Sequence, residues 1–433
     1  MIELLIRNAT LLDGTRGIDI AVDSGVIIGK GMQLDYQARQ EFQLGGKLII
    51  PGFVDPHVHL DIILMNSFEK PGRTEPYLSH YGLNDTVERR REGFTSGDIE
   101  ERAGAALELA SRHGITALRA QCHVDTKVGL KHIEALQRVK EQYAGRVTVQ
   151  IVTFPQQGFS RNPGTLDLIR EAFQSGADVV GCASNLDFDS AGKVDFKKHI
   201  DTAFDMALEL GVDLDIHADL GIPRDVELDD LEIVHVARRT IELGYQGRVA
   251  AGHVCALGSA SQDVAQKAIE LIKEADISVI SQPDLYRLGR DDTQNVRRGL
   301  TRVKELLAAG VNVTYASNNV RDALRPMGNL NPLEEALILS YGAHMDTIEE
   351  FDTLMKMSTY NAAKALQLPN YGLEEGCDAD FIILDAYTPS GAIVGQVEKN
   401  YVFKAGRLMA SSRVVSEIFN GTYLQEVKKT EVN

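Results

Sequence analysis

Four of the eleven histidines stand in short apolar segments that alternate like β-strands. His57 and His59 form an HVH pair, and His217 and His253 follow in two later segments of the same kind. Strand side chains alternate between faces, so residues i and i+2 point the same way and can hold one ion together. Imidazole nitrogens suit Zn²⁺ and Fe²⁺, and three protein ligands plus a water is the layout of a hydrolytic metal site. An isolated HxH pair is more often a surface or packing feature, so the prediction of a metal or catalytic cluster depends on the fold.

The chain between its two ends is a repeat of short apolar runs, most of them followed by a helical pattern. Eight such units over about 300 residues is the count of an α/β fold of the (β/α)8 TIM barrel type. The carboxyl ends of barrel strands meet on one face, which would bring the four histidines together. A doubly wound sheet is the alternative, but no GxGxxG turn follows the first strand. The eight runs are residues 52–60, 115–121, 147–155, 177–183, 212–218, 248–254, 277–283 and 311–317.

Both ends of the chain alternate like strands broken by glycine turns, as in "IDIAVDSGVIIGKG" and "KNYVFKAGRLMASS". This pattern predicts one small discontinuous β-sandwich domain from residues 1–50 and 372–425. The barrel, with the metal-dependent active site, then occupies residues 51–371.

Composition narrows the class of partner. A net charge of −17 argues against nucleic acid, because binding to phosphates is driven by lysine and arginine. No apolar run is long enough to span a bilayer, and the N-terminus does not have the pattern of a signal peptide. The four scattered cysteines, without a CxxC pair, fit reduced thiols. We therefore expect a cytoplasmic enzyme that acts on a small molecule and has neither a nucleic-acid nor a membrane partner.

Several of these motifs resemble those of the amidohydrolase superfamily. "IIPGFVDPHVHLD", "DIHADLG", "AGHVCALG" and "YASNNVRD" resemble its metal-binding strand ends, and "YGLEEGCDADFIILDA" resembles its C-terminal signature. More narrowly, "VQIVTFPQQGF" and "NNVRDALRPMGNLNPLEEAL" are similar to segments of the bacterial cytosine deaminases and N-isopropylammelide hydrolases of that superfamily. The likeness covers nearly the whole chain.

The resemblance implies roles for particular residues. His57, His59 and His217 would bind one divalent ion (zinc, or iron or manganese), and His253 would polarise the substrate or hold the attacking water. Gln156 matches a glutamine that hydrogen-bonds the substrate ring. Water activated by the metal would attack an amidine carbon and expel ammonia or an amine. The resemblance also implies a homo-oligomer. For His123, which lies just past the second strand, two interpretations stay open: it lines the pocket without binding metal, or it does not line the pocket. The six remaining histidines are expected to be structural or exposed.

Asn318 falls where the family has an aspartate that ligates the metal and moves the proton of the attacking water. An amide oxygen can coordinate a cation weakly, but it cannot accept and return a proton near neutral pH. Three interpretations compete. The asparagine is an engineered inactivating change, or a natural variant in which Asp322 or Asp219 is the base, or the mark of a relative that only binds.

Two neighbouring positions also depart from the cytosine deaminase pattern. Leu220 stands where those enzymes have a glutamate that protonates the ring, and Asn319 replaces a second aspartate that contacts substrate. Asn319 and Asp322 are candidate substrate-binding residues, although Asp322 could instead cap a helix beginning at "ALRPMG". A pocket with these neutral residues indicates a neutral, amide-like or N-substituted ring.

We therefore predict a metal-dependent amidohydrolase that deaminates a nitrogen heterocycle such as an aminopyrimidine or aminotriazine. In this prediction His253 and Asn318 are the catalytic residues, and Asn318 is a weak fourth metal ligand. Two alternatives stay open: ring-opening hydrolysis of a cyclic amide, and a catalytically silent barrel that binds a ligand.

Overall fold

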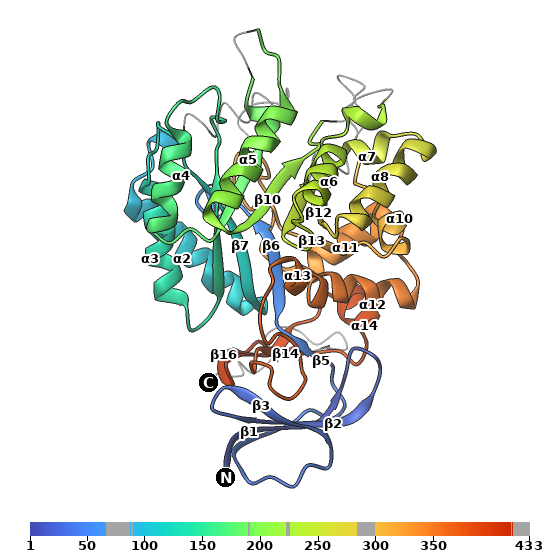
Figure 1. Cartoon of the computed structure of the whole chain (residues 1–433). Helices are drawn as coiled ribbons and strands as arrows, with labels where there is room; N and C mark the ends of the chain where they lie inside the picture. Colours follow the sequence, from blue (N-terminus) through green and yellow to red (C-terminus); the bar gives the residue numbers. More distant parts are fainter. Residues whose placement is uncertain are drawn as a thin grey trace.

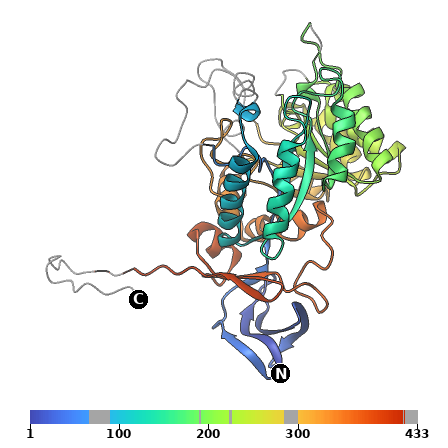
Figure 2. The same cartoon turned by 90° about the vertical axis from the view of Figure 1, so that its left-hand side faces the viewer.

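The computed structural model describes residues 1–65, 87, 90–188, 191–221, 226–283, 299–416 and 418. A barrel of parallel strands surrounded by helices forms the larger part, and a β-rich unit made from both chain ends lies below it in Figure 1. Figure 2 shows the strands of the two chain ends packed together at the base of the barrel. The expected TIM barrel with a small β-sandwich is confirmed.

The barrel is one eight-stranded parallel sheet in which each strand pairs with the next along the chain. An isolated parallel bridge between Val58 and Asn318 joins the first strand to the end of the last and closes the ring. The eight strands are β6 (Phe53–Val58), β7 (Ile115–His123), β8 (Thr148–Phe154), β9 (Val179–Ala183), β10 (Asp213–Ala218), β11 (Val249–His253), β12 (Ser278–Ser281) and β13 (Val313–Tyr315).

Alternation along the strands divides their side chains between the barrel interior and the core shared with the helices. On β10, Leu214 and Ile216 pack into the core shared with the helices, while Asp215 and His217 contact side chains from other strands. The same period of two puts Ile280 of β12 into a small cluster with Ala250 and Ala316. The residues that follow these inward positions at the strand ends therefore line the mouth of the barrel.

The helices begin and end with ordinary capping chemistry. Thr95 caps the helix that begins at Ser96, a Thr347–Glu350 capping box starts another, and Gly211 ends a third in the left-handed region. The helices are α2 (Ser96–Arg112), α3 (Lys131–Tyr143), α4 (Thr165–Gln174), α5 (Phe196–Leu210), α6 (Glu232–Glu242), α7 (Ala256–Ser259), α8 (Gln262–Glu274), α10 (Val303–Ala308), α11 (Pro332–Ala343), α12 (Ile348–Met357), α13 (Tyr360–Ala365) and α14 (Pro389–Gly395), with 3-10 turns η1 (Ser184–Leu186) and η2 (Leu228–Asp230). Within the described ranges no helix is both long and apolar enough to cross a membrane.

The terminal unit contains two four-stranded sheets, ordered β3-β2-β1-β4 and β16-β15-β14-β5. The two sheets share one core, in which Ile6, Ile20, Phe381 and Phe403 are fully buried. Strands from opposite chain ends pair directly, because β5 lies antiparallel to β14. The strands are β1 (Ile2–Thr10), β2 (Arg16–Asp23), β3 (Val26–Met32), β4 (Ala38–Gln43), β5 (Ile49–Pro51), β14 (Phe381–Leu384), β15 (Lys399–Lys404) and β16 (Arg407–Ala410).

Candidate active site

Three histidines converge at the carboxyl end of the barrel, as the sequence analysis expected. The Nε2 atom of His217 lies 3.1 Å from Nε2 of His57 and 3.3 Å from Nε2 of His59. All three side chains are buried, with exposed fractions of 0% for His57, 6% for His59 and 3% for His217. The cluster arises because β6 supplies two histidines near its end and β10 supplies the third on its inward face.

The separation of these nitrogens fits a shared metal ion. Two ligands at about 2.05 Å from a tetrahedral ion stand about 3.3 Å apart, close to the distances found. Burial, reinforced by the neighbouring imidazoles, holds the pKa of His59 and of His217 well below the ordinary histidine range. Both rings are therefore neutral near pH 7, which is the form that coordinates a metal. The residues present fit one divalent ion.

A buried carboxylate orients the His57 ring. Asp215 Oδ1 lies 3.5 Å from His57 Nδ1, and Gln121 Nε2 donates to that same oxygen over 3.0 Å. Arg119 donates to the other Asp215 oxygen over 3.2 Å. Burial alone would raise the pKa of Asp215, but its contacts with His57 and Arg119 lower it below the ordinary range. An anionic Asp215 favours Nδ1–H on His57 and leaves Nε2 to face the cluster, the arrangement that supports metal-binding histidines.

Asn318 lies beside this cluster with its main chain fixed on both sides. Its N–H donates to the His57 carbonyl over 2.9 Å, and its carbonyl accepts from the His59 N–H over 2.9 Å. The residue is 3% exposed and has a left-handed φ of 56°. Asp55 supports the same junction, because its carboxylate accepts from the backbone N–H groups of His57 and Ser317.

His253 joins the cluster from β11. Its ring centroid lies 5.2 Å from that of His217 and 5.8 Å from that of His57. One of its ring nitrogens lies within 4.8 Å of ligating atoms on both of those histidines. Its φ of 74° is unusual for a residue with a side chain, and strain of this kind concentrates at functional positions. The four predicted histidines therefore form one group.

Asp219, one of the two alternative bases, is engaged by helix α6. Its carboxylate accepts from the backbone N–H groups of Glu232 over 2.7 Å and Ile233 over 3.1 Å. Glu232 returns the contact by accepting from the Asp219 N–H over 2.6 Å. Burial, together with the charge of Glu232, raises the pKa of Asp219 to about 8. These contacts make Asp219 a brace between β10 and α6, and Leu220 beside it offers no proton.

Asp322, the other alternative base, is engaged within its own loop. Its Oδ2 accepts from the Asn319 side-chain amide over 2.6 Å, and its Oδ1 accepts from Leu324 N and Arg325 N. Burial raises the pKa of Asp322 to about 6. The alternative that Asp322 caps a helix is wrong, because the chain stays non-helical until α11 begins at Pro332. The structure brings Asn319 and Asp322 together as a bonded pair.

Gln156 stands at the end of a buried chain of polar groups. Its Oε1 lies 3.2 Å from His123 Nε2, and His123 Nδ1 lies 2.6 Å from Asp61 Oδ2. His132 Nδ1 approaches the same carboxylate oxygen at 2.7 Å, and its Nε2 contacts the Arg91 carbonyl at 3.2 Å. Distances of 2.6–2.7 Å are those of charge-assisted hydrogen bonds and are too short for two ligands of one ion. Asp61, His123 and His132 thus form a hydrogen-bonded brace.

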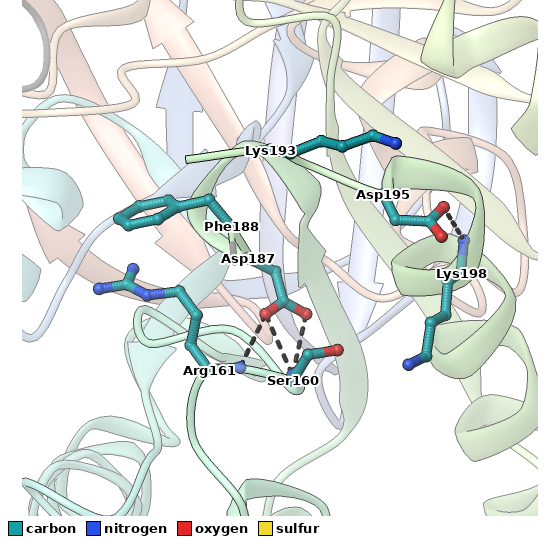
Figure 3. A pocket seen from close by; sticks show the side chains of 7 residues that line it. All are labelled: Ser160, Arg161, Asp187, Phe188, Lys193, Asp195 and Lys198. Carbon is teal, nitrogen blue, oxygen red and sulfur yellow. Dashed lines mark hydrogen bonds between the residues drawn. The ribbon is translucent and has the colours of Figure 1, made fainter. Parts of the chain in front are cut away.

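The loop after Gln156 opens a side cavity of about 620 Å³ (Figure 3). Asp187 accepts from the backbone N–H groups of Ser160 and Arg161, so the "FSRNPG" segment is held as a turn. The Arg161 guanidinium stacks over the Phe188 ring, and Lys193 and Lys198 are exposed. The two carboxylates that line the cavity, Asp187 and Asp195, accept hydrogen bonds from the main chain.

The sequence analysis missed the residues that support the site. Asp215 and Asp61 each lie two residues from a predicted ligand, His217 or His59, so the same strand period could have identified them. Gln121 lies on β7 two residues before His123, so the same strand period could have identified it too. His132 was expected to be structural, and it is, but its bond to Asp61 depends on how α3 packs against the barrel, which no local pattern reveals.

Comparisons with known proteins identify the family of this chain and related structures. The sequence model of the amidohydrolase family matches residues 83–408. The chain is 28% identical over 421 residues to N-isopropylammelide isopropyl amidohydrolase of Pseudomonas sp. (strain ADP), covering 95% of this chain and 98% of that protein. It is 28% identical over 412 residues to pterin deaminase of Rhizobium rhizogenes (strain K84 / ATCC BAA-868), covering 92% and 89%. The crystal structure of 5-methylcytosine deaminase from Klebsiella pneumoniae with phosphonocytosine superimposes with a TM-score of 0.86 at 28% identity, covering 96% of this chain and 100% of that one.

Proposed function

Since the chain belongs to the amidohydrolase family, we propose that it is a metal-dependent hydrolase that cleaves an exocyclic C–N bond of a nitrogen heterocycle. The observation that carries the proposal is the convergence of three buried histidine Nε2 atoms at 3.1–3.3 Å, with Asp215 behind His57. The relatives named above support the substrate class, because ammelide, pterin and 5-methylcytosine are all nitrogen heterocycles.

His57, His59 and His217 hold one divalent ion (zinc, iron or manganese), the set of metals that imidazole sites accept. When bound, the ion supplies Lewis-acid activation of water. Asp215, which accepts hydrogen bonds from Gln121 and Arg119, keeps His57 in the orientation that the ion requires. The burial of all three rings excludes bulk water from the site.

His253 carries the proton in this proposal. Asn318 cannot accept one, and both Asp219 and Asp322 already accept hydrogen bonds on each carboxylate oxygen. In the overall reaction the oxygen of water bonds to the ring carbon, the exocyclic C–N bond breaks, and the nitrogen leaves with a proton. His253 accepts the proton from water and returns it to the departing nitrogen, as a general acid–base group does.

The binding residues of the site are neutral amides. Gln156 and Asn319 contact the heterocycle, with the Asn319 side chain oriented by Asp322. Neutral groups select an uncharged ring, because an ionised ligand buried without a charged partner would lose its hydration uncompensated.

Metal content and product release together test the proposal. We expect about one equivalent of zinc, iron or manganese per chain after purification without chelator, and release of ammonia or amine from cytosine, pterin or N-isopropylammelide. His253→Gln should retain the metal and lose turnover. His235→Gln, a helix position 17% exposed at its side chain, should retain both.

Three other results would contradict parts of the proposal. Folded protein that stays free of metal would refute the metal site. Ring consumption without free ammonia or amine would indicate ring-opening hydrolysis. Tight ligand binding by metal-loaded protein without turnover would favour a binding barrel, the reading that Asn318 and Leu220 support.

A further inference from the structure

The main-chain groups of Ser317 and Asn318 are held from two directions. The Ser317 N–H donates to both Asp55 oxygens over 3.3 Å, and the Asn318 N–H and carbonyl bond to main-chain groups at and just after the end of β6. The Ser317 carbonyl accepts from Nη1 of Arg325 over 3.0 Å. The peptide that leads into Asn318 is therefore fixed on one side by β6 and on the other side by a guanidinium.

Arg325 belongs to the loop after β13 and also holds that loop together. Its main-chain N–H donates to Asp322 Oδ1 over 2.9 Å, and its carbonyl accepts from the Asp322 N–H over 3.0 Å. Asp322 in turn accepts from the Asn319 side-chain amide over 2.6 Å. A Cβ atom added to Gly328 would lie 3.5 Å from Arg325 Cζ and 3.6 Å from the Asn319 carbonyl oxygen, so the guanidinium lies close to the Asn319 main chain. Arg325 thus contacts both the strand end and the loop that carries Asn319.

Glu335 of helix α11 compensates the charge of Arg325. Nη2 of Arg325 lies 2.8 Å from Oε1 of Glu335, and the two side chains are 6% and 1% exposed. A buried guanidinium without a counter-charge is strongly unfavourable, so Glu335 keeps the Arg325 side chain inside the protein. Leu333, Ala336 and Leu339 of α11 lie in the core of the barrel, which makes the helix a firm anchor for the pair.

We infer that Arg325, held by Glu335, is a positioning residue that sets the place of Asn318 and Asn319 beside the histidine cluster. Arg325 acts through the main chain, because its bond to the Ser317 carbonyl fixes the peptide before Asn318. Buried ion pairs often contribute no more stability than an apolar pair of the same volume, so stability alone does not explain this one. The expected effect on turnover rests on the proposed function, whereas the effect on the loop does not.

A double replacement separates positioning from stability. Arg325→Met/Glu335→Leu removes both charges together, so it leaves no uncompensated buried charge and should keep the melting temperature of wild type. It also removes the donor to the Ser317 carbonyl. Main-chain amides of residues 316–327 should therefore exchange with deuterium about tenfold or more faster than in wild type. Mass spectrometry of peptides from metal-loaded protein measures this at about pH 8, above the pKa of about 7 that burial gives Glu335.

The same double replacement should reduce turnover without loss of metal. The histidines of the cluster belong to the ends of β6 and β10, so metal content should equal that of wild type. The value of kcat/KM for ammonia or amine release should fall about tenfold or more, since misplacing a group by about 1 Å costs on the order of 100-fold in rate. A pair that served only stability would leave kcat/KM unchanged in a variant as stable as wild type.

Arg325→Lys is a second variant, in which the buried charge stays paired. The guanidinium contacts Glu335 and the Ser317 carbonyl through two separate nitrogens, whereas an ammonium offers one point of contact. Arg325→Lys should therefore show the same faster exchange and lower kcat/KM, to a smaller extent. It keeps the inference testable if the double replacement does not fold.

Arg248→Met is the matched control. Arg248 also joins a carboxylate to a main-chain carbonyl, with Nε 3.0 Å from Asp213 Oδ1 and Nη2 donating to the Gly211 carbonyl over 2.8 Å. It directly precedes β11, at the opposite end of the strands from the histidine cluster. Its replacement should leave exchange in residues 316–327 and kcat/KM unchanged.

Two results would overturn the inference. Wild-type exchange in both Arg325 variants would show that the guanidinium does not hold the loop. Faster exchange with unchanged kcat/KM would show that the loop loosens without effect on the reaction. If wild type releases no ammonia or amine from cytosine, pterin or N-isopropylammelide, the hydrolase proposal fails, and the exchange measurement decides by itself whether Arg325 positions the loop.

Discussion

Asn318 donates its backbone N–H to the His57 carbonyl oxygen over 2.9 Å, and this bond closes the barrel beside the histidine cluster. The position of residue 318 is thus set by the main chain and not by its side chain. An aspartate has almost the same shape as an asparagine, so it should occupy this place without disturbing the bridge. The difference between them is one proton acceptor beside three histidines.

Replacing Asn318 by aspartate should therefore raise turnover. The carboxylate adds a general base and a negative charge near the ion, and a positioned base contributes about 100- to 10,000-fold. We expect Asn318→Asp to increase kcat for ammonia or amine release by at least about 100-fold, measured on metal-loaded protein. Asn318→Ala is the control and should not gain activity. An unchanged kcat in Asn318→Asp would show that the chain's own base already suffices.

Asp215 should matter for metal affinity more than for folding. It holds the Nδ1 side of His57, and partners of this kind typically contribute 10- to 100-fold in affinity. We expect Asp215→Asn to weaken the metal dissociation constant by about that factor, measured by competition with a chromophoric chelator. Asp213→Asn, on the same strand but bonded to the partly exposed Arg248, should bind metal as wild type does. If Asp215→Asn bound metal as tightly as wild type, Asp215 would not contribute to metal affinity.

Gly252 should be intolerant of even one methyl group. A Cβ there would come within 3.3 Å of the His57 ring and displace it, and metal sites depend on ligand positions within about 0.5 Å. We expect Gly252→Ala to weaken metal binding by about tenfold in the same competition assay. Gly97→Ala is the control, because its added Cβ meets only Thr95 Oγ1 at 4.0 Å. Wild-type affinity in Gly252→Ala would show that the ring has room to move.

The barrel and its four histidines were predictable because each depends on local pattern. Eight apolar runs separated by turn residues predict eight strands. A histidine near the carboxyl end of such a strand lies at the mouth of the barrel, independently of how the helices pack. The engagement of Asp219 by α6 depends on tertiary packing and was not predictable. Asp219 was expected near His217 because it follows two residues later, but only the register of α6 shows that its oxygens accept from Glu232 and Ile233.

Gln282 illustrates the same limit from the other side. Its position after a predicted strand was visible, yet the pattern does not reveal that its buried side-chain amide has no partner among the described residues. The amide lies in the space left by Gly252 next to the His57 ring, where nothing among the described residues bonds to it. Sequence pattern assigns residues to faces, whereas hydrogen-bond satisfaction requires the coordinates of every neighbour.

Glu335 should make stability depend on pH. It lies on α11, 1% exposed, with Arg325 Nη2 at 2.8 Å. Burial, opposed by Arg325, raises its pKa from 4.5 to about 7. Between these values the folded protein keeps a proton that the unfolded chain has lost, so stability falls as pH rises through this window.

Unfolding experiments at several pH values check this sign. From pH 4.5 to pH 7 the free energy of unfolding of wild type should fall relative to Glu335→Gln, by on the order of 3 kcal/mol. Glu334→Gln, at the half-buried position beside it, controls for the loss of one charge on α11. A difference between wild type and Glu335→Gln that stays constant with pH would mean that Glu335 is ionised throughout by its pairing with Arg325.

His132 should be required for stability although it lies outside the metal cluster. It is fully buried, and its Nδ1 lies 2.7 Å from Asp61 Oδ2 while its Nε2 faces the Arg91 carbonyl. A carboxylate and a backbone carbonyl only accept, so both ring nitrogens of His132 face acceptors. His132→Phe keeps a ring of similar size but removes both contacts, which leaves the buried Asp61 carboxylate with His123 alone.

Breaking a buried pair in this way typically costs 3–5 kcal/mol, so we expect His132→Phe to lower the free energy of unfolding by about 3 kcal/mol. Chemical denaturation measures it, with His235→Phe as the control. His235 pairs with the partly exposed Asp201, and its replacement should cost less than about 1 kcal/mol. A comparably small loss for His132→Phe would show that His123 alone is a sufficient partner for Asp61. The orientation of Gln156, which His123 contacts, would then depend on His123 and Asp61 and not on His132.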